Sequence, residues 1–208
     1  EPAAQADTAQ ADTAAESAAD SNAAAAVTVS AEGGINVCLA SEPATLDPAL
    51  NSSVDGATMI LHLFSGLAKW EQNASGVLEI VPDLATDLPE GVVNADGTVT
   101  YTYTLKDGLK WSDGSDLTAN DFVFSWKRAV SQELAADYGY MFEVVKGYAE
   151  VWDEANPEPD ALAVEAPDDK TLVVTLNNEV AFWNELLAFP TYLPVKEDVV
   201  ANESWATD

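Results

Sequence analysis

The stretch "TVTYTYTL" constrains the fold of this chain more than any other. Within residues 98–105, apolar and aromatic residues alternate with four threonines. Alternation with a period of two indicates a strand with one buried face, and Val, Tyr and Thr favour strands. Asp107 and Gly108 follow as a typical tight-turn pair. We therefore expect an antiparallel strand over 98–105, then a turn into a short strand, Leu109–Trp111.

The next stretch, "KWSDGSDLTANDF", is dense in carboxylates. Asp113 and Asp116 fit Asx-type turns around Gly114. They could instead be the paired carboxylates of a hydrolase, or metal ligands. A Ca²⁺ loop needs ligands at alternating positions and a closing Glu, which this stretch lacks. Nucleophile-elbow, HExxH and phosphate-loop motifs are also missing from the sequence. We expect a structural turn, no metal site, no cofactor and no enzymatic activity.

An amphipathic helix is predicted to begin after Thr118. Apolar residues such as Phe122 and Trp126 recur there at spacings of three and four. Thr118 is the expected N-cap, and Asp121 can reach back to the cap amide and favour the positive helix end. We expect Trp126 to lie in the core because it belongs to the apolar face, and Trp111 because it ends a strand.

Local patterns also predict several shorter elements. Turn residues and short apolar runs bound them. We expect a strand in "INVCLA", a helix over Gly56–Leu67, a hairpin of Leu162–Glu165 and Thr171–Leu176 with a turn at 167–169, and a short helix in "AFWNELLAF" that Pro190 ends.

Composition excludes several functions. The net charge is −28 with only eight Lys and Arg residues, which argues against nucleic-acid binding and against docking on an anionic membrane. A single cysteine, Cys38, excludes an internal disulfide, and we expect it to be a small buried side chain in a strand. The single histidine, His62, lies in an apolar run and is expected in the core or an interface. No apolar run approaches the length of a membrane span.

The first 32 residues differ from the rest. They are rich in alanine and acidic residues, and "AQADT" occurs twice in succession. Such a segment buries too little apolar surface to offset its ordering entropy. We expect a disordered acidic tether over residues 1–32.

Several ordered motifs together resemble a known family. They are "SEPATLDP" (41–48), "FSGLAKWE" (64–71), "VPDLAT" (81–86), the block from Tyr101 to Val130, and "DDKTLVVTLN" (168–177). In this order they resemble the extracytoplasmic oligopeptide-binding proteins of ABC importers, a family that also includes dipeptide and nickel binders. The resemblance covers about residues 35–208. Because family members are more than twice as long, we expect an N-terminal fragment.

The resemblance implies an α+β fold of the periplasmic-binding-protein type (type II, cluster C). A partial first lobe would carry an inserted α/β domain with antiparallel strands. The expected division is 33–64 for the start of the first lobe, 65–194 for the inserted domain and 195–208 for the return to the first lobe, truncated here.

The same resemblance implies how a ligand binds. The family holds an extended peptide by main-chain pairing, and two lobes close over it. The pairing segment follows the "LDP" motif, which here makes Asn51, Ser52, Ser53 and Val54 the candidate ligand-binding residues. A tyrosine after the long helix approaches the ligand in close relatives, and Tyr138 aligns with it.

The expected partners are an oligopeptide ligand and ABC permease subunits, with the binding protein itself a monomer. The expected location is extracytoplasmic, with a lipid anchor on a cysteine other than Cys38, because Cys38 follows Val37 rather than a small residue. Alternatives are another solute on the same fold (a dipeptide, nickel or haem, or a sugar) and a surface interaction protein in which the tether is a cell-wall spacer.

Overall fold

The computed structural model describes residues 28–29, 35–202 and 205–206. They fall into two units, Glu1–Ala40 and Ser41–Asp208. In the first unit, Thr28–Val29 (β1) pairs antiparallel with Ile35–Asn36 (β2). The rest of the predicted tether lies outside the described residues.

The prediction for Cys38 was wrong. Its side chain is exposed, and β2 ends two residues before it. A two-residue hairpin pairs too little backbone to build a buried layer around a neighbouring side chain.

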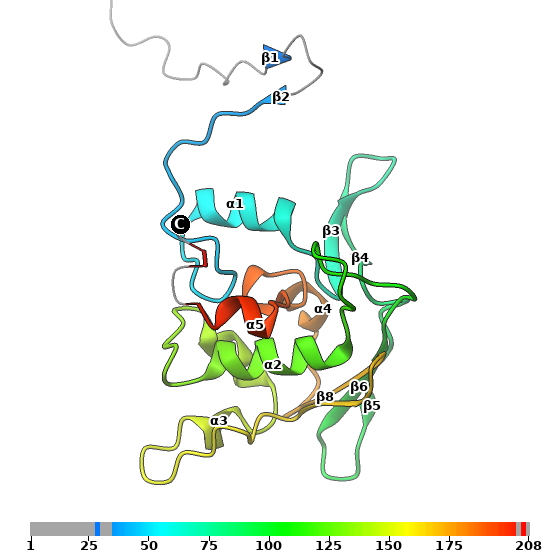
Figure 1. Ribbon diagram of the computed structural model, residues 1–208. Coiled ribbons are helices and arrows are strands. Elements are labelled where there is room, and N and C mark those ends of the chain that lie inside the picture. Colours follow the sequence, from blue (N-terminus) through cyan, green and yellow to red (C-terminus); the bar gives the residue numbers. More distant parts are fainter. Residues whose placement is uncertain (1–27, 30–34, 203–204, 207–208) are drawn as a thin grey trace, which may run out of the picture. The chain divides into compact units, whose positions relative to one another are not determined.

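The second unit is an α+β structure built on antiparallel strands (Figure 1). Its larger sheet has the order β5-β6-β8-β7, and every neighbouring pair is antiparallel. A separate hairpin, β3 with β4, was not predicted from the sequence. The strands are β3 Ala68–Gln72, β4 Leu78–Pro82, β5 Val92–Val93, β6 Val99–Thr104, β7 Val164–Asp168 and β8 Thr171–Leu176.

The alternating stretch forms β6, as predicted. Its apolar and tyrosine side chains are buried, while its threonines are more exposed. Tyr103 lies opposite Leu172 of β8, and both are fully buried. The indole N–H of Trp183 donates to the Tyr103 hydroxyl at 2.8 Å. The polar atoms of both buried side chains therefore have a partner within the core.

Helices cover and flank the sheet. The helices are α1 Val54–Leu63, α2 Ala119–Val130, α3 Tyr148–Val151, α4 Trp183–Leu186 and α5 Glu197–Val200, with 3₁₀ turns η1 Gly139–Val144 and η2 Pro190–Tyr192. No described helix has both the length and the apolar character needed to cross a bilayer.

Helix α1 differs in its bounds from the prediction. It begins earlier because Ser53 caps it, its Oγ accepting from Gly56 N at 3.1 Å. It ends at Leu63 because Phe64 is already extended, and the following residues lead into β3. His62, expected in the core or an interface, is exposed on its last turn.

Helix α2 has the predicted start. Asp121 Oδ2 accepts from the backbone amide of Thr118 at 2.7 Å. The helix packs against β7, β8 and η2, and it lies alongside α5 (Figure 1). Trp126 is fully buried, as predicted, and its indole donates to the Tyr192 carbonyl at 2.9 Å.

The prediction for Trp111 was wrong. Its side chain is only half-buried, because Leu109–Trp111 does not join the sheet. That stretch makes only an isolated bridge between Lys110 and Asp116. The later hairpin is confirmed, although its first strand begins two residues later than expected and runs from Val164 to Asp168, into the expected turn at 167–169.

Side chains of α2 also hold the segment after η2. Ser125, which is 3% exposed, accepts a hydrogen bond from the amide of Val195 at 2.8 Å. Its hydroxyl lies 2.6 Å from the carbonyl oxygen of Asp121, to which it donates. The path of the chain from Tyr192 to Val195 is therefore fixed by α2.

Candidate functional site

Asn51 and Ser53 shape the loop before α1 through bonds to each other. The Asn51 amide donates to the Ser53 carbonyl at 3.0 Å, and its Oδ1 accepts from the Ser53 hydroxyl at 3.1 Å. Asn51 is 5% exposed. These two side chains therefore serve the loop and the helix cap, and neither side chain projects freely into solvent.

Ser52 and Val54 are the exposed members of the segment. Ser52 is exposed, and the side chain of Val54 is 83% exposed. Within the described part of the chain, the backbone N–H and C=O of Ser52 have no hydrogen-bond partner. Ser53 has extended backbone angles, φ −109° and ψ 150°. Backbone of this kind can pair with an extended chain laid beside it.

Tyr138 lies in a different part of the fold. It precedes η1, and its ring meets that of Phe189 edge-on, with centroids 5.1 Å apart. It is half-buried. No hydrogen bond or ring contact joins Tyr138 to residues 51–54 within the described residues, so the structure does not bring these candidates into direct contact.

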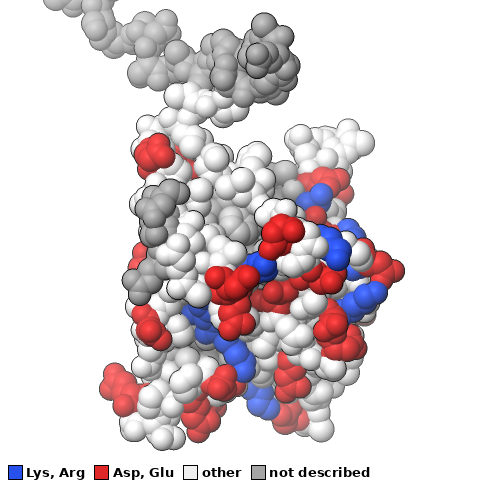
Figure 2. Space-filling view, viewed as in Figure 1, with Lys and Arg blue, Asp and Glu red and all other residues white. Residues whose placement is uncertain are grey.

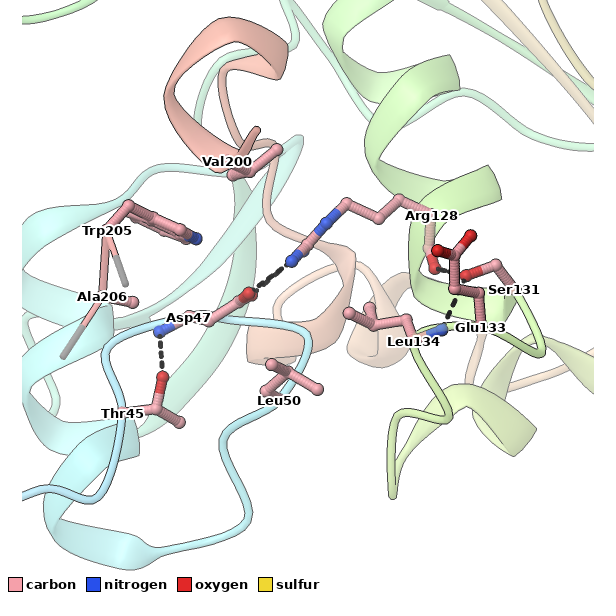
Figure 3. A pocket seen from close by; sticks show the side chains of 10 residues that line it. All are labelled: Thr45, Asp47, Leu50, Arg128, Ser131, Glu133, Leu134, Val200, Trp205 and Ala206. Carbon is pink, nitrogen blue, oxygen red and sulfur yellow. Dashed lines mark hydrogen bonds and ion pairs between the residues drawn. The ribbon is translucent and has the colours of Figure 1, made fainter. Parts of the chain in front are cut away.

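A pocket of about 470 Å³ adjoins the 51–54 segment (Figure 3). Asp47 and Arg128 meet in it, with the two guanidinium nitrogens 2.6 and 3.2 Å from the two carboxylate oxygens. Asp47 Oδ1 also accepts from Ala49 N, and the Asp47 carbonyl accepts from Asn51 N. The turn that leads into residues 51–54 is therefore fastened to α2 through this ion pair.

The acidic pair that could have been a hydrolase site is divided between two ion pairs. Asp113 accepts from Ser115 in the predicted Asx turn and pairs with Lys196. Asp116 instead pairs with Lys110, because the bridge between these two residues places them side by side. Hydrogen bonds from Lys196 and Ser115 hold the pKa of Asp113 below its ordinary value of 3.8. Across the described residues, no three His, Cys, Asp or Glu side chains are grouped as a metal site.

The surface is acidic, and nearly all of its few basic side chains are in ion pairs. Basic side chains lie next to acidic side chains on the face shown in Figure 2. Of the eight basic residues, all except Lys106 form an ion pair among the described residues. The protein therefore has little free positive charge with which to bind an anion.

Sequence reasoning missed the pocket residues. It singled out neither Asp47 nor Arg128 as a candidate. The two are 81 positions apart, so no local pattern joins them. Only the packing of the loop against α2 reveals the pair.

Comparison with known proteins agrees with the predicted fold. The family described as bacterial extracellular solute-binding proteins, family 5 (middle region), matches residues 79–208. The oligopeptide-binding protein OppA of Bacillus subtilis is 38% identical over 176 residues, which cover 84% of this chain and 30% of the relative. YgiS of Escherichia coli, named a probable deoxycholate-binding periplasmic protein, is 37% identical over 169 residues, covering 80% of this chain and 30% of the relative.

A solved structure gives the same result. Listeria monocytogenes OppA bound to peptide superposes with a TM-score of 0.68 at 32% identity, over 79% of this chain and 31% of that one. The chain thus spans about a third of the length of these relatives, 30% to 31%. The predicted α+β fold of the periplasmic-binding-protein type is confirmed, and the chain belongs to family 5 of the bacterial extracellular solute-binding proteins.

Proposed function

We propose that this protein is the substrate-binding component of an ABC transporter, and that it captures oligopeptides outside the cytoplasmic membrane for a permease. The observation that carries this proposal is the similarity to OppA, both in sequence and to a structure titled as bound to peptide. The two similarities cover 84% and 79% of this chain.

The unpaired backbone of Ser52 supports a specific binding mode. An extended peptide laid beside it would donate to its C=O and accept from its N–H, and these bonds do not depend on the peptide's side chains. Val54 would add an exposed apolar contact. In this proposal, Asn51 and Ser53 hold the loop in the receptive shape, and Tyr138 approaches the ligand from the segment before η1.

We further propose the wider organisation that the family resemblance implies. Residues 1–32 would be a tether, 33–64 and 195–208 parts of the first lobe, and 65–194 the inserted domain. The protein would act as a monomer, lipid-anchored at the outer face of the cell membrane.

Substitution of Ser52 tests the backbone-pairing mode. Ser52→Pro removes the N–H, so affinity for a pool of tetra- and pentapeptides should fall at least about tenfold, as for the loss of one well-made hydrogen bond. Ser52→Ala keeps the backbone and should bind within about twofold of the wild type. Isothermal titration calorimetry measures both, and circular dichroism checks that the proline variant remains folded.

The chemical class of the ligand is tested by comparing peptides with a different kind of solute. Deoxycholate is the suitable competitor, because a relative of almost equal identity is named for it. A ligand that binds only the folded state raises the melting temperature. A rise in melting temperature with peptides and not with deoxycholate supports the proposal. A rise with deoxycholate alone would contradict it and would indicate that the protein binds bile acids instead.

A further inference from the structure

The pocket beside the pairing segment has an unusual balance of charge. Its one cation, Arg128, is neutralised by Asp47 through two bonds, and the side chains are only 16% and 2% exposed. Glu133 also lines the pocket and has no ion pair within the described residues. The pocket therefore has one carboxylate without a counter-ion and no basic group free to neutralise it.

Apart from the hydroxyl-bearing residues Thr45 and Ser131, the remaining lining residues are apolar or aromatic. Leu50 comes from the turn before α1, Leu134 from the loop after α2, and Val200 from the end of α5 (Figure 3). Trp205 closes another side with its indole, which is half-buried. An aromatic face attracts a cation, and aliphatic walls suit the methylene stem of a long basic side chain.

The overall charge favours the same kind of ligand. The chain carries −28 charges, and nearly every basic residue is already paired. A field of this sign attracts cationic ligands and repels anionic ones. Among ligands that fit an apolar pocket, a positively charged one is therefore the best complement.

The position of the pocket connects it to peptide binding. Leu50 in its wall is the residue before Asn51, and Asp47 accepts hydrogen bonds from both of their amides at 3.2 and 2.9 Å. A peptide paired with Ser52 therefore runs within a few residues of the pocket. A long side chain extending from such a peptide can reach it, since successive Cα atoms are only about 3.8 Å apart.

We propose that the pocket formed by Leu50, Glu133, Leu134, Val200 and Trp205 binds the side chain of a lysine or arginine residue of the captured peptide. The side-chain charge faces Glu133, and the stem lies against the apolar walls and the indole. This inference rests on the proposed peptide-binding function for its setting, but the pocket can be tested without a peptide.

The first experiment uses single amino-acid amides on the whole chain. N-acetyl-lysine amide and N-acetyl-norleucine amide share a four-carbon side-chain stem and differ in the terminal ammonium group. Titration is followed by the indole N–H signal of Trp205 in NMR spectra, assigned with Trp205→Phe. We expect the lysine amide to bind about three- to tenfold more tightly, the range that an exposed ion pair and a cation–π contact give.

Two matched variants show which carboxylate is responsible for the preference for lysine over norleucine. Glu133→Gln removes the ion pair but not the contact with the Trp205 indole, so it should lower the lysine preference by at least about twofold and leave norleucine binding unchanged. Glu154→Gln changes the net charge equally on the exposed 153–158 loop and should preserve the preference. If both variants lose the preference to the same extent, the general acidity of the protein selects cations and the pocket inference is overturned.

Two other results also decide the matter. Equal binding of the two amides, or no shift of Trp205 with either, refutes the inference. Tighter binding of N-acetyl-glutamine amide than of the lysine amide refutes it too, because the N–H groups of Arg128 would then select the ligand. If the lysine amide binds as expected while no peptide binds, the pocket assignment stands and the proposed peptide function fails.

Discussion

The Asp47 carboxylate lies 2.6 Å from the Arg128 guanidinium, although the two residues are 81 positions apart in sequence. Asp47 is 1% exposed, and its Oδ1 also accepts from Ala49 N. A planar guanidinium that meets a carboxylate through two nitrogens fixes orientation as well as distance. The pair therefore sets how the turn before α1 is placed on α2, and with it the position of residues 51–54.

Removing one partner of this pair should be costly. Arg128→Met leaves the Asp47 carboxylate buried without a counter-ion, and the free energy of unfolding should fall by about 3–5 kcal/mol. Urea denaturation measures this. The control is Lys110→Met, which breaks the exposed Lys110–Asp116 pair and should cost under about 1 kcal/mol. Similar losses in the two variants would show that Asp47 is solvated.

The hydroxyl of Ser125 should matter more than a serine on a helix usually does. Ser125→Ala removes the acceptor of the Val195 amide in a buried place, which should cost about 1–3 kcal/mol. Ser112→Ala, at an exposed position, should change stability by less than about 0.5 kcal/mol. Thermal unfolding and urea denaturation of both variants measure the two losses of stability. A neutral Ser125→Ala would mean that water replaces the hydroxyl.

Two glycines with the same backbone conformation should respond differently to alanine. Gly147 and Gly97 have φ of +89° and +87°. A Cβ on Gly147 would lie 1.8 Å from the Ala161 carbonyl oxygen, whereas nothing lies within 4 Å of one on Gly97. Gly97→Ala should cost about 1–2 kcal/mol from the left-handed conformation alone. Gly147→Ala should cost clearly more, because backbone must move, and equal costs in urea denaturation would contradict this.

The ion pair between Asp113 and Lys196 predicts that the stability of the fold depends on pH in the acid range. The pKa of Asp113 is lowered in the folded state by hydrogen bonds from Lys196 and Ser115, relative to an ordinary 3.8. The unfolded chain therefore takes up the proton first as the pH falls, and the stabilisation is present above about pH 4 and lost below it. Asp113→Asn should make unfolding less dependent on pH below 4 while leaving the dependence between pH 5 and 7 unchanged. An identical acid limb in both proteins would rule out this role.

Local features of the fold were predictable because they depend on neighbours in sequence. The alternation that became β6 and the cap of Thr118 by Asp121 need only a few adjacent residues. The β3–β4 hairpin was missed because its strand "AKWEQ" mixes charged residues with Trp70 and has no clean alternation. Trp111 was misplaced because its burial depended on a strand that the sheet does not include.

The candidate site was predictable only through family resemblance. Nothing in "NSSV" distinguishes a binding segment from an ordinary loop. Its physical character, an unpaired backbone at Ser52 held between Asn51 and Ser53, depends on hydrogen bonds that only the structure shows. The adjoining pocket depends on contacts between segments far apart in the chain, which periodicity and turn signals do not report.

The bonds between Asn51 and Ser53 have a thermodynamic consequence for any ligand of this loop. Because the loop is ordered by its own side chains, the Ser52 backbone is pre-organised before a ligand arrives. The conformational entropy lost on binding is then mainly that of the ligand. Among peptides of equal length and charge, those already stiffened towards an extended shape should therefore bind with the smaller entropic cost.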